Sequence, residues 1–158
     1  MNLFAHTRLF DVFNKVKKLD EGKIFVDVIS EKQVQRFIVE LNTDQLRFQF
    51  MNSEGVPLSD IGGEYSPFTM NEAQKKGQPK KSQSDVDLYD EGDYHRSFRI
   101  DRIRATSFDI TSDPVKDDGT NLLAEWGAEI EGLTFESLAK ASEYMLSFYR
   151  DKLRGYLA

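Results

Sequence analysis

A helical stripe of apolar residues opens the chain. Its members are Leu9, Val12, Phe13, Val16 and Leu19. Three lysines, at positions 15, 17 and 18, would lie on the opposite face of a helix with this spacing, and Gly22 follows them in the sequence. Apolar residues at intervals of three and four favour an amphipathic helix, and glycine commonly ends one. The pattern therefore predicts a first helix that ends at Gly22.

A second stripe follows, and its apolar residues are Val34, Phe37, Ile38 and Leu41. Ser30 and Gln33 form a capping-box pattern, in which each side chain satisfies a free backbone N–H, so we expect this helix to begin at Ser30. The β-branched residues of 23–29 are consistent with a short strand or with the lead-in to the helix. Residues 46, 48 and 50 are apolar and alternate, which predicts a change to extended structure.

Residues 52–86 have a different composition and contain three of the four prolines. Such a stretch predicts a long irregular excursion, with room for a short helix from Pro67 to Lys76. Long connections in compact domains are uncommon, and many are binding loops or segments that become ordered on assembly. This excursion is the clearest indication in the residues themselves that the protein acts by contact.

In the last third of the chain, apolar and polar residues first alternate as in strands and then follow the pattern of helices. Residues 97–103 and 106–111 predict a hairpin with its bend at Arg104 and Ala105, and residues 121–126 predict a short helix that stops at Gly127. Thr134 is a good N-cap for a final helix, with Leu133 and Leu138 at staple positions. The buried stripe predicted for that helix is Leu138, Ala141, Met145, Phe148 and Lys152 or Leu153.

These elements predict an α+β fold over residues 1–158, with one domain. N-terminal helices and a long C-terminal helix are expected to pack on a small antiparallel sheet, with a long central loop at about 52–86. The 158 residues are enough to bury one core but not two.

The amino-acid composition excludes several classes of function. The chain has no cysteine, so disulfides, zinc–thiolate sites and thiol catalysis are excluded. Neither a signal-peptide pattern nor an apolar run of membrane-spanning length occurs, so we expect an intracellular protein with no membrane partner. The net charge is −6, yet residues 73–84 carry four lysines and no acid. An acidic body argues against sequence-specific nucleic-acid binding, whereas the lysine segment could dock an acidic surface or stay solvated.

The segment DLYDEGDYHRSFRI, residues 87–100, is the strongest candidate for chemistry. Five acids lie between Asp85 and Asp93, followed by His95 and by four arginines up to Arg104. The segment does not match an EF-hand calcium loop, because Tyr89 and Phe98 occupy two positions at which such a loop has carboxylate ligands. No nucleophile elbow, phosphate-binding glycine motif or paired metal histidine occurs, and His6 is distant in sequence. We expect no catalytic residue, metal or cofactor.

The remaining interpretation of the segment is structural. Asp90, Glu91, Gly92 and Asp93 have the composition of a tight turn, or Asp93 caps a short helical turn that continues to Ser97. The turn would join the loop to the sheet, with its apolar side chains in the core and its charges in water. The residues predicted for this structural joint are Leu88, Gly92, Tyr94 and Phe98.

Three segments resemble one family in the right order, across roughly residues 40–140. DLYDEGDYHRSFRI is similar to the L-x-x-T-G-x-h-x-x-S-h segment (h, apolar) of small tail-completion and virion-morphogenesis proteins of tailed phages and prophages, except that Glu91 replaces the usual threonine. The preceding run, LNTDQLRFQFMNSEGVPLSDIGGEYSPFTMNEAQKKGQP, resembles the D-G-x-x-L-x-x-Y-S-P-x-T-x-x-x-K-x-x-K-G-x-P run of Bacteroides-type relatives. LLAEWGAEIEGLTFESLA resembles their segment before the terminal helix. The first 30 residues match nothing beyond a helix.

The resemblance implies a non-enzymatic structural component of virion assembly at the head–tail neck or tail terminus. The partners implied are further copies in a ring and other neck or tail proteins. The locations implied are the cytoplasm of the bacterial host and, after assembly, the virion. We further hypothesise that lysines of one copy face acids of the next in a heterologous, ring-closing interface. The candidate interface residues are Lys75, Lys76, Lys80, Lys81, Asp85, Asp87, Asp90, Glu91 and Asp93.

Two alternatives from other classes stay open. One is an intracellular adaptor or regulatory protein unrelated to virions, which a genomic neighbourhood of portal, capsid and tail genes would argue against. The other is a metal-assisted hydrolase that uses the acids of residues 85–93, for which metal-dependent thermal stabilisation would be the first sign.

Overall fold

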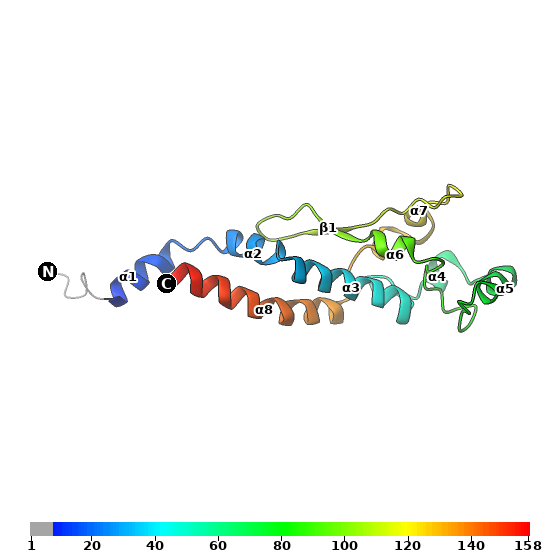
Figure 1. Ribbon diagram of the computed structural model, residues 1–158, viewed down its shortest axis with the longest axis horizontal. Coiled ribbons are helices and arrows are strands. Elements are labelled where there is room, and N and C mark those ends of the chain that lie inside the picture. The colour runs from blue at the N-terminus through cyan, green and yellow to red at the C-terminus, as the bar shows by residue number, and fades with distance from the viewer. Residues whose placement is uncertain (1–7) are drawn as a thin grey trace.

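Helices make up most of the computed structural model, which describes residues 8–158 (Figure 1). Its elements in chain order are α1 (Arg8–Lys17), α2 (Glu21–Ile29), α3 (Lys32–Phe48), α4 (Ser59–Gly62), α5 (Pro67–Lys75), α6 (Asp93–Ser97), β1 (Arg99–Asp101), β2 (Asp109–Thr111), α7 (Leu122–Trp126), a 3-10 turn (Ala128–Ile130) and α8 (Phe135–Leu157). The α+β class and the long C-terminal helix are confirmed.

The molecule is elongated. In Figure 1, α2 and α3 lie between the hairpin above and α8 below, while α1 projects at one end and α5 occupies the other. Strands β1 and β2 pair antiparallel, with Ile100 opposite Ile110. The main core lies where α2 and α3 meet α8 and the hairpin, and its fully buried side chains include Ile24, Ile38 and Leu46. Within residues 8–158, no helix combines the length and apolar character that a membrane crossing requires.

Two predictions near the second helix were wrong. Residues 23–29 are neither a strand nor the start of α3. They form most of a separate helix, α2, capped by the Asp20 side chain, which accepts a hydrogen bond from the backbone N–H of Lys23 at 3.0 Å. Gly22 therefore lies in the first turn of α2 instead of ending α1. Burial of one face, including Ile24 and Val28, outweighs the strand preference of the β-branched residues.

The predicted capping box at Ser30 was also wrong. Helix α3 begins at Lys32, and its N-cap residue Glu31 makes no side-chain capping bond. Ser30 ends α2 instead, and its hydroxyl donates to the Val26 carbonyl at 2.7 Å. A serine hydroxyl can satisfy a carbonyl of the preceding turn as readily as an N–H of the next one, so the pattern alone was ambiguous. Helix α3 also continues to Phe48, so the extended segment predicted from residue 46 was wrong up to that point.

Other predicted elements are present. Helix α5 matches the short helix expected inside the 52–86 excursion, and Ser66 caps it by accepting from the Thr69 N–H at 3.1 Å. Helix α7 is capped by Asn121 and ends before Gly127. Thr134 caps α8 by accepting from the Ser137 N–H at 3.2 Å. Trp126, the last residue of α7, is buried.

A close approach between Gly62 and Trp126 fixes α4 against α7. A Cβ built on Gly62 would fall on the indole ring of Trp126, which is buried and cannot swing away. We therefore expect Gly62→Ala to lower the free energy of unfolding by about 1–3 kcal/mol, the usual cost of overpacking. Urea denaturation followed by tryptophan fluorescence measures this.

Gly155, in the exposed last turns of α8, gives the matched control. No atom lies within 4 Å of a Cβ at this position. Gly155→Ala should leave stability unchanged or raise it by about 0.5–1 kcal/mol, because alanine is the better helix former. Equal effects of the two substitutions would contradict the packing of α4 on α7.

Candidate functional site

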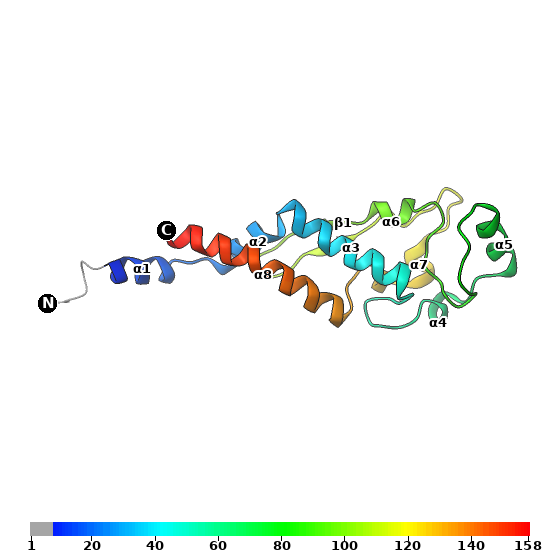
Figure 2. The same cartoon turned by 60° about the horizontal axis from the view of Figure 1, so that its bottom comes forward.

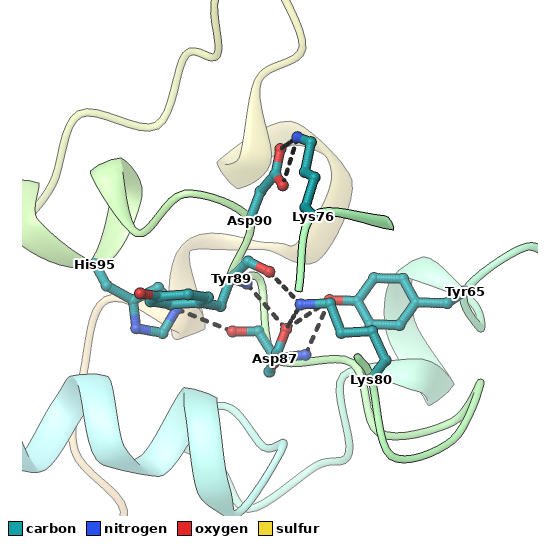
Figure 3. A network of polar contacts seen from close by, with 7 residues as sticks. All are labelled: Tyr65, Lys76, Lys80, Asp87, Tyr89, Asp90 and His95. Atoms are coloured by element: carbon teal, nitrogen blue, oxygen red, sulfur yellow. Dashed lines mark hydrogen bonds and ion pairs between the residues drawn. The ribbon is translucent and has the colours of Figure 1, made fainter. Parts of the chain in front are cut away.

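The acidic segment of residues 85–93 meets the long excursion at one carboxylate, that of Asp87 (Figure 3). It accepts hydrogen bonds from the Tyr65 hydroxyl at 2.8 Å, from Lys80 Nζ at 2.7 Å and from the Tyr89 N–H at 3.0 Å. Lys80 also donates to the Tyr89 carbonyl. The side chains of Lys80 and Asp87 are only 7% and 16% exposed. This is a largely buried ion pair, and the Oδ1 atom of Asp87 accepts all three of these hydrogen bonds.

Aromatic and cationic side chains enclose the pair. His95, on α6, donates from Nε2 to the backbone carbonyl of Asp87 at 2.9 Å, and its ring meets the Tyr89 ring edge-on at 5.3 Å. The Arg47 guanidinium, near the end of α3, lies 3.8 Å from the centroid of the Tyr89 ring. Three separate parts of the chain, α3, the excursion and α6, are therefore tied together at this point. We call Tyr65, Lys80, Asp87, Tyr89 and His95 the Asp87 network.

Burial sets the protonation of the network. It raises the pKa of the Tyr65 phenol above its ordinary value, and the negative charge of Asp87 raises it further. Burial lowers the pKa of His95 below its ordinary value, and this effect outweighs the hydrogen bond to Asp87. At neutral pH the phenol therefore keeps its proton and the imidazole is uncharged. Both groups act as neutral hydrogen-bond donors.

The lowered pKa of His95 gives a pH dependence with a definite sign. The unfolded chain binds a proton near pH 6.5, while the folded chain resists protonation, so stability is retained above that pH and is lost as the pH falls through the folded pKa. Urea denaturation between pH 7.5 and 5 should show this decline. In His95→Gln the decline should become shallower. An unchanged slope would contradict a buried, neutral His95.

Apart from the half-buried Asp85, the other candidate interface residues are exposed, and some of them are paired within one chain. Lys76 lies 2.9 Å from Asp90 and 3.6 Å from Glu91. Lys75 pairs with Glu72 on its own helix at 2.6 Å, and Asp93 pairs with Arg96. Exposed pairs of this kind contribute little to stability and can exchange partners.

Two of the residues predicted for the contact between copies cannot take part in it, because they are paired inside one chain. Lys80 and Asp87, part of the predicted interface, are held inside the Asp87 network, whereas Lys75, Lys76, Lys81 and the acids at 90, 91 and 93 face solvent. Asp85 is half-buried. The lysine-to-acid interface between copies stays a prediction for the exposed set.

The four residues predicted for the structural joint all lie where the excursion meets the sheet. Leu88, Tyr94 and Phe98 are buried, and the rings of Tyr94 and Phe98 pack edge-to-face at 5.0 Å. Gly92 adopts φ 85° immediately before α6, and a Cβ there would lie 2.9 Å from atoms of Arg96 and Tyr89. Asp93 is the first residue of the helical turn that continues to Ser97.

The Asp87 network holds the base of the 52–86 excursion in place, and its polar groups already have partners within the chain. Asp87 is paired with Lys80, and His95 is bonded to backbone. Across the part of the chain that the structure describes, no three His, Asp or Glu side chains are grouped to hold a metal ion. A surface pocket of about 450 Å³ beside the joint is lined by acids including Asp93, Asp113 and Asp118.

Two buried amide side chains, those of Gln45 and Asn42, were not predicted from the sequence. Gln45, on α3, donates from Nε2 to the Gly132 carbonyl at 3.2 Å and accepts from the Thr134 N–H at 2.8 Å. Asn42, one turn earlier, donates to the Ile130 carbonyl at 3.0 Å. Both side chains are fully buried. They fix the segment from which α8 departs, and polar residues on the core-facing side of a helical stripe were the available signal.

Comparison of the chain with protein-family models, with curated proteins and with solved structures finds no match in any of the three.

Proposed function

We propose that the protein is a non-enzymatic structural component of phage or prophage virion assembly, at the head–tail neck or the tail terminus. The observation that carries the proposal is the ordered set of three sequence segments across roughly residues 40–140, which resemble those of tail-completion and morphogenesis proteins. Such a component acts through contacts between subunits and needs no catalytic centre.

The shape of the molecule supports a contact role. The body is elongated, and the excursion with α5 occupies the end opposite α1 (Figure 1). The Asp87 network anchors the base of this excursion, while three of its lysines, at 75, 76 and 81, are exposed. An anchored loop with a charged outer surface can meet a neighbour without first having to become ordered, which lowers the entropic cost of the contact.

Deletion of the gene from a lysogen that carries it tests the proposal. After prophage induction, electron microscopy should show filled heads and tails that remain unjoined or malformed, and expression of the wild-type chain should restore infectious particles. Normal particles from the deletion strain would contradict the proposal and favour the intracellular adaptor. A genomic neighbourhood without portal, capsid or tail genes would count against it in the same way.

The charged interface has its own test within this experiment. A variant with glutamate at positions 75, 76 and 81 keeps Lys80, so the Asp87 network remains intact. We expect it to fold with wild-type stability but to fail to complement the deletion. Full complementation would exclude these lysines as the contact while leaving the virion role in place.

A further inference from the structure

Helix α8 buries very little of itself. Of its 23 residues, Phe135–Leu157, only Ser137 and Ala141 are buried. A half-buried set that includes Tyr144 and Phe148 packs toward α3, where the rings of Phe37 and Tyr144 stack at 4.2 Å. The side of α8 turned away from α2 and α3 remains open except near its C-terminal end, where α1 packs on it and Lys15 donates to the Ala158 carbonyl at 2.8 Å. In Figure 1 this helix runs along the lower side of the molecule, and in Figure 2, with that side brought forward, it runs beside α3.

A second apolar stripe follows this open side. At about 100° per residue its members fall within an arc of about 80°, which begins about 60° from the buried Ala141 and about 100° from the buried Ser137. The exposed members are Phe135, Leu138, Leu146 and Tyr156, whereas Tyr149 and Leu153 lie within the same arc but are half-buried against the core. Tyr156 lies at the edge beside α2, where its hydroxyl donates to the Asp27 carboxylate at 2.8 Å. Phe135 is 88% exposed, and Leu138 and Leu146 are 48% and 46% exposed. Exposed apolar side chains of this size on one side of a helix indicate a helix seam that lacks its partner.

The surface area agrees with a missing partner. The chain exposes 10418 Å², whereas a compact monomer of its mass exposes about 8,000 Å². The excess, about 2,000 Å², is spread over the elongated molecule, and a stable protein interface needs to bury only roughly 800 Å² of it per partner. An elongated chain with a thin core can cover this area by pairing with another copy.

Charges beside the stripe select the direction of pairing. Glu143 and Arg150 lie on the same flank of the stripe, and neither has an ion-pair partner among the side chains that the structure describes. In an antiparallel pair of identical helices the same flanks meet, so a pair centred on Leu146 places Glu143 beside Arg150 of the second copy. A parallel pair would bring like residues of the two helices level and lose this match.

We propose that α8 pairs with α8 of a second copy, antiparallel about a two-fold axis at Leu146. The interface is isologous, so each Glu143–Arg150 contact occurs twice. Opposed helix dipoles add a small favourable contribution. The proposal goes beyond the virion role and does not depend on it. The pair is separate from the charged surface of α5, which lies at the other end of the molecule (Figure 1).

Single cysteines test both the pairing and its direction, because the natural chain has none. In Leu146→Cys the two thiols meet at the axis, so a short bis-maleimide should link most of the full-length chains into dimers. Phe135→Cys and Tyr156→Cys should each give almost no dimer, because the two copies of either residue lie about 30 Å apart. The double variant with both cysteines should link efficiently. Linkage of all three single variants would indicate a parallel pair, and linkage of none would overturn the proposal.

Charge variants test the register without cross-linking. Leu146→Glu places two carboxylates face to face at the axis and should weaken association at least 100-fold by sedimentation equilibrium. Ser147→Glu makes the same change in charge one residue away, on the polar face, and should leave it unchanged. Glu143→Arg or Arg150→Glu alone should weaken the dimer about 10-fold, and the double exchange should restore it. Failure of the double exchange to restore binding would overturn the antiparallel register.

Discussion

Asp87→Asn is expected to lower the free energy of unfolding by about 3–5 kcal/mol, because it leaves the ammonium group of Lys80 buried without an opposite charge. The side chain of Lys80 is 7% exposed, so water cannot replace the lost partner without opening the base of the excursion. Asparagine keeps the shape of the side chain and one accepting oxygen, so the loss reports the charge. Urea denaturation at pH 7 measures it.

Asp90→Asn is the control for this prediction. Asp90 also pairs with a lysine, Lys76, at a similar distance of 2.9 Å, but both side chains are exposed. The expected loss is below about 1 kcal/mol, as for other exposed pairs. Adding Lys80→Met to Asp87→Asn should recover part of the loss, because no unpaired charge then remains. Similar losses at 87 and 90, or no recovery in the double variant, would contradict a buried ion pair.

Gln45→Leu is expected to cost about 2–4 kcal/mol, because it leaves two buried backbone groups without partners. The amide of Gln45 bonds to both the Gly132 carbonyl and the Thr134 N–H, and leucine has a similar volume but can bond to neither. Thr134 caps α8, so the loss falls at the point where that helix starts.

Gln33→Leu, an exposed position in the first turn of α3, is the matched control and should change stability by no more than about 0.5 kcal/mol. Circular dichroism during urea denaturation gives both values. Equal effects at the two positions would show that the loss at Gln45 does not come from its buried hydrogen bonds.

The sequence predicted elements whose signals are local. The Thr134 cap, the Asn121–Trp126 turn and the Pro67 helix are each specified by a few neighbouring residues, and all three are present. Prediction failed where one local signal had two uses. Ser30 could cap the following helix or end the preceding one, and the burial of residues such as Val28 decided between them.

The candidate site depended on contacts that no periodicity encodes. Lys80 and Asp87 are seven residues apart in an irregular segment, and Tyr65 reaches the same carboxylate from 22 residues away. The acids were therefore recognised as a group, but the one that lies at the centre of the network could not be singled out. Gln45 was not predicted because the stripe of α3 was defined by its apolar residues alone, although Gln45 lies within the same core-facing arc.

Light scattering on the full-length protein, coupled to size-exclusion chromatography over a wide range of concentration and salt, tests most directly the claim that this protein acts through contacts between its copies. The account predicts an average mass that rises with concentration to at least twice that of one chain. Salt should weaken any larger assembly held by exposed lysines more than it weakens the apolar pairing of α8. A mass of one chain at every concentration and salt would contradict the account.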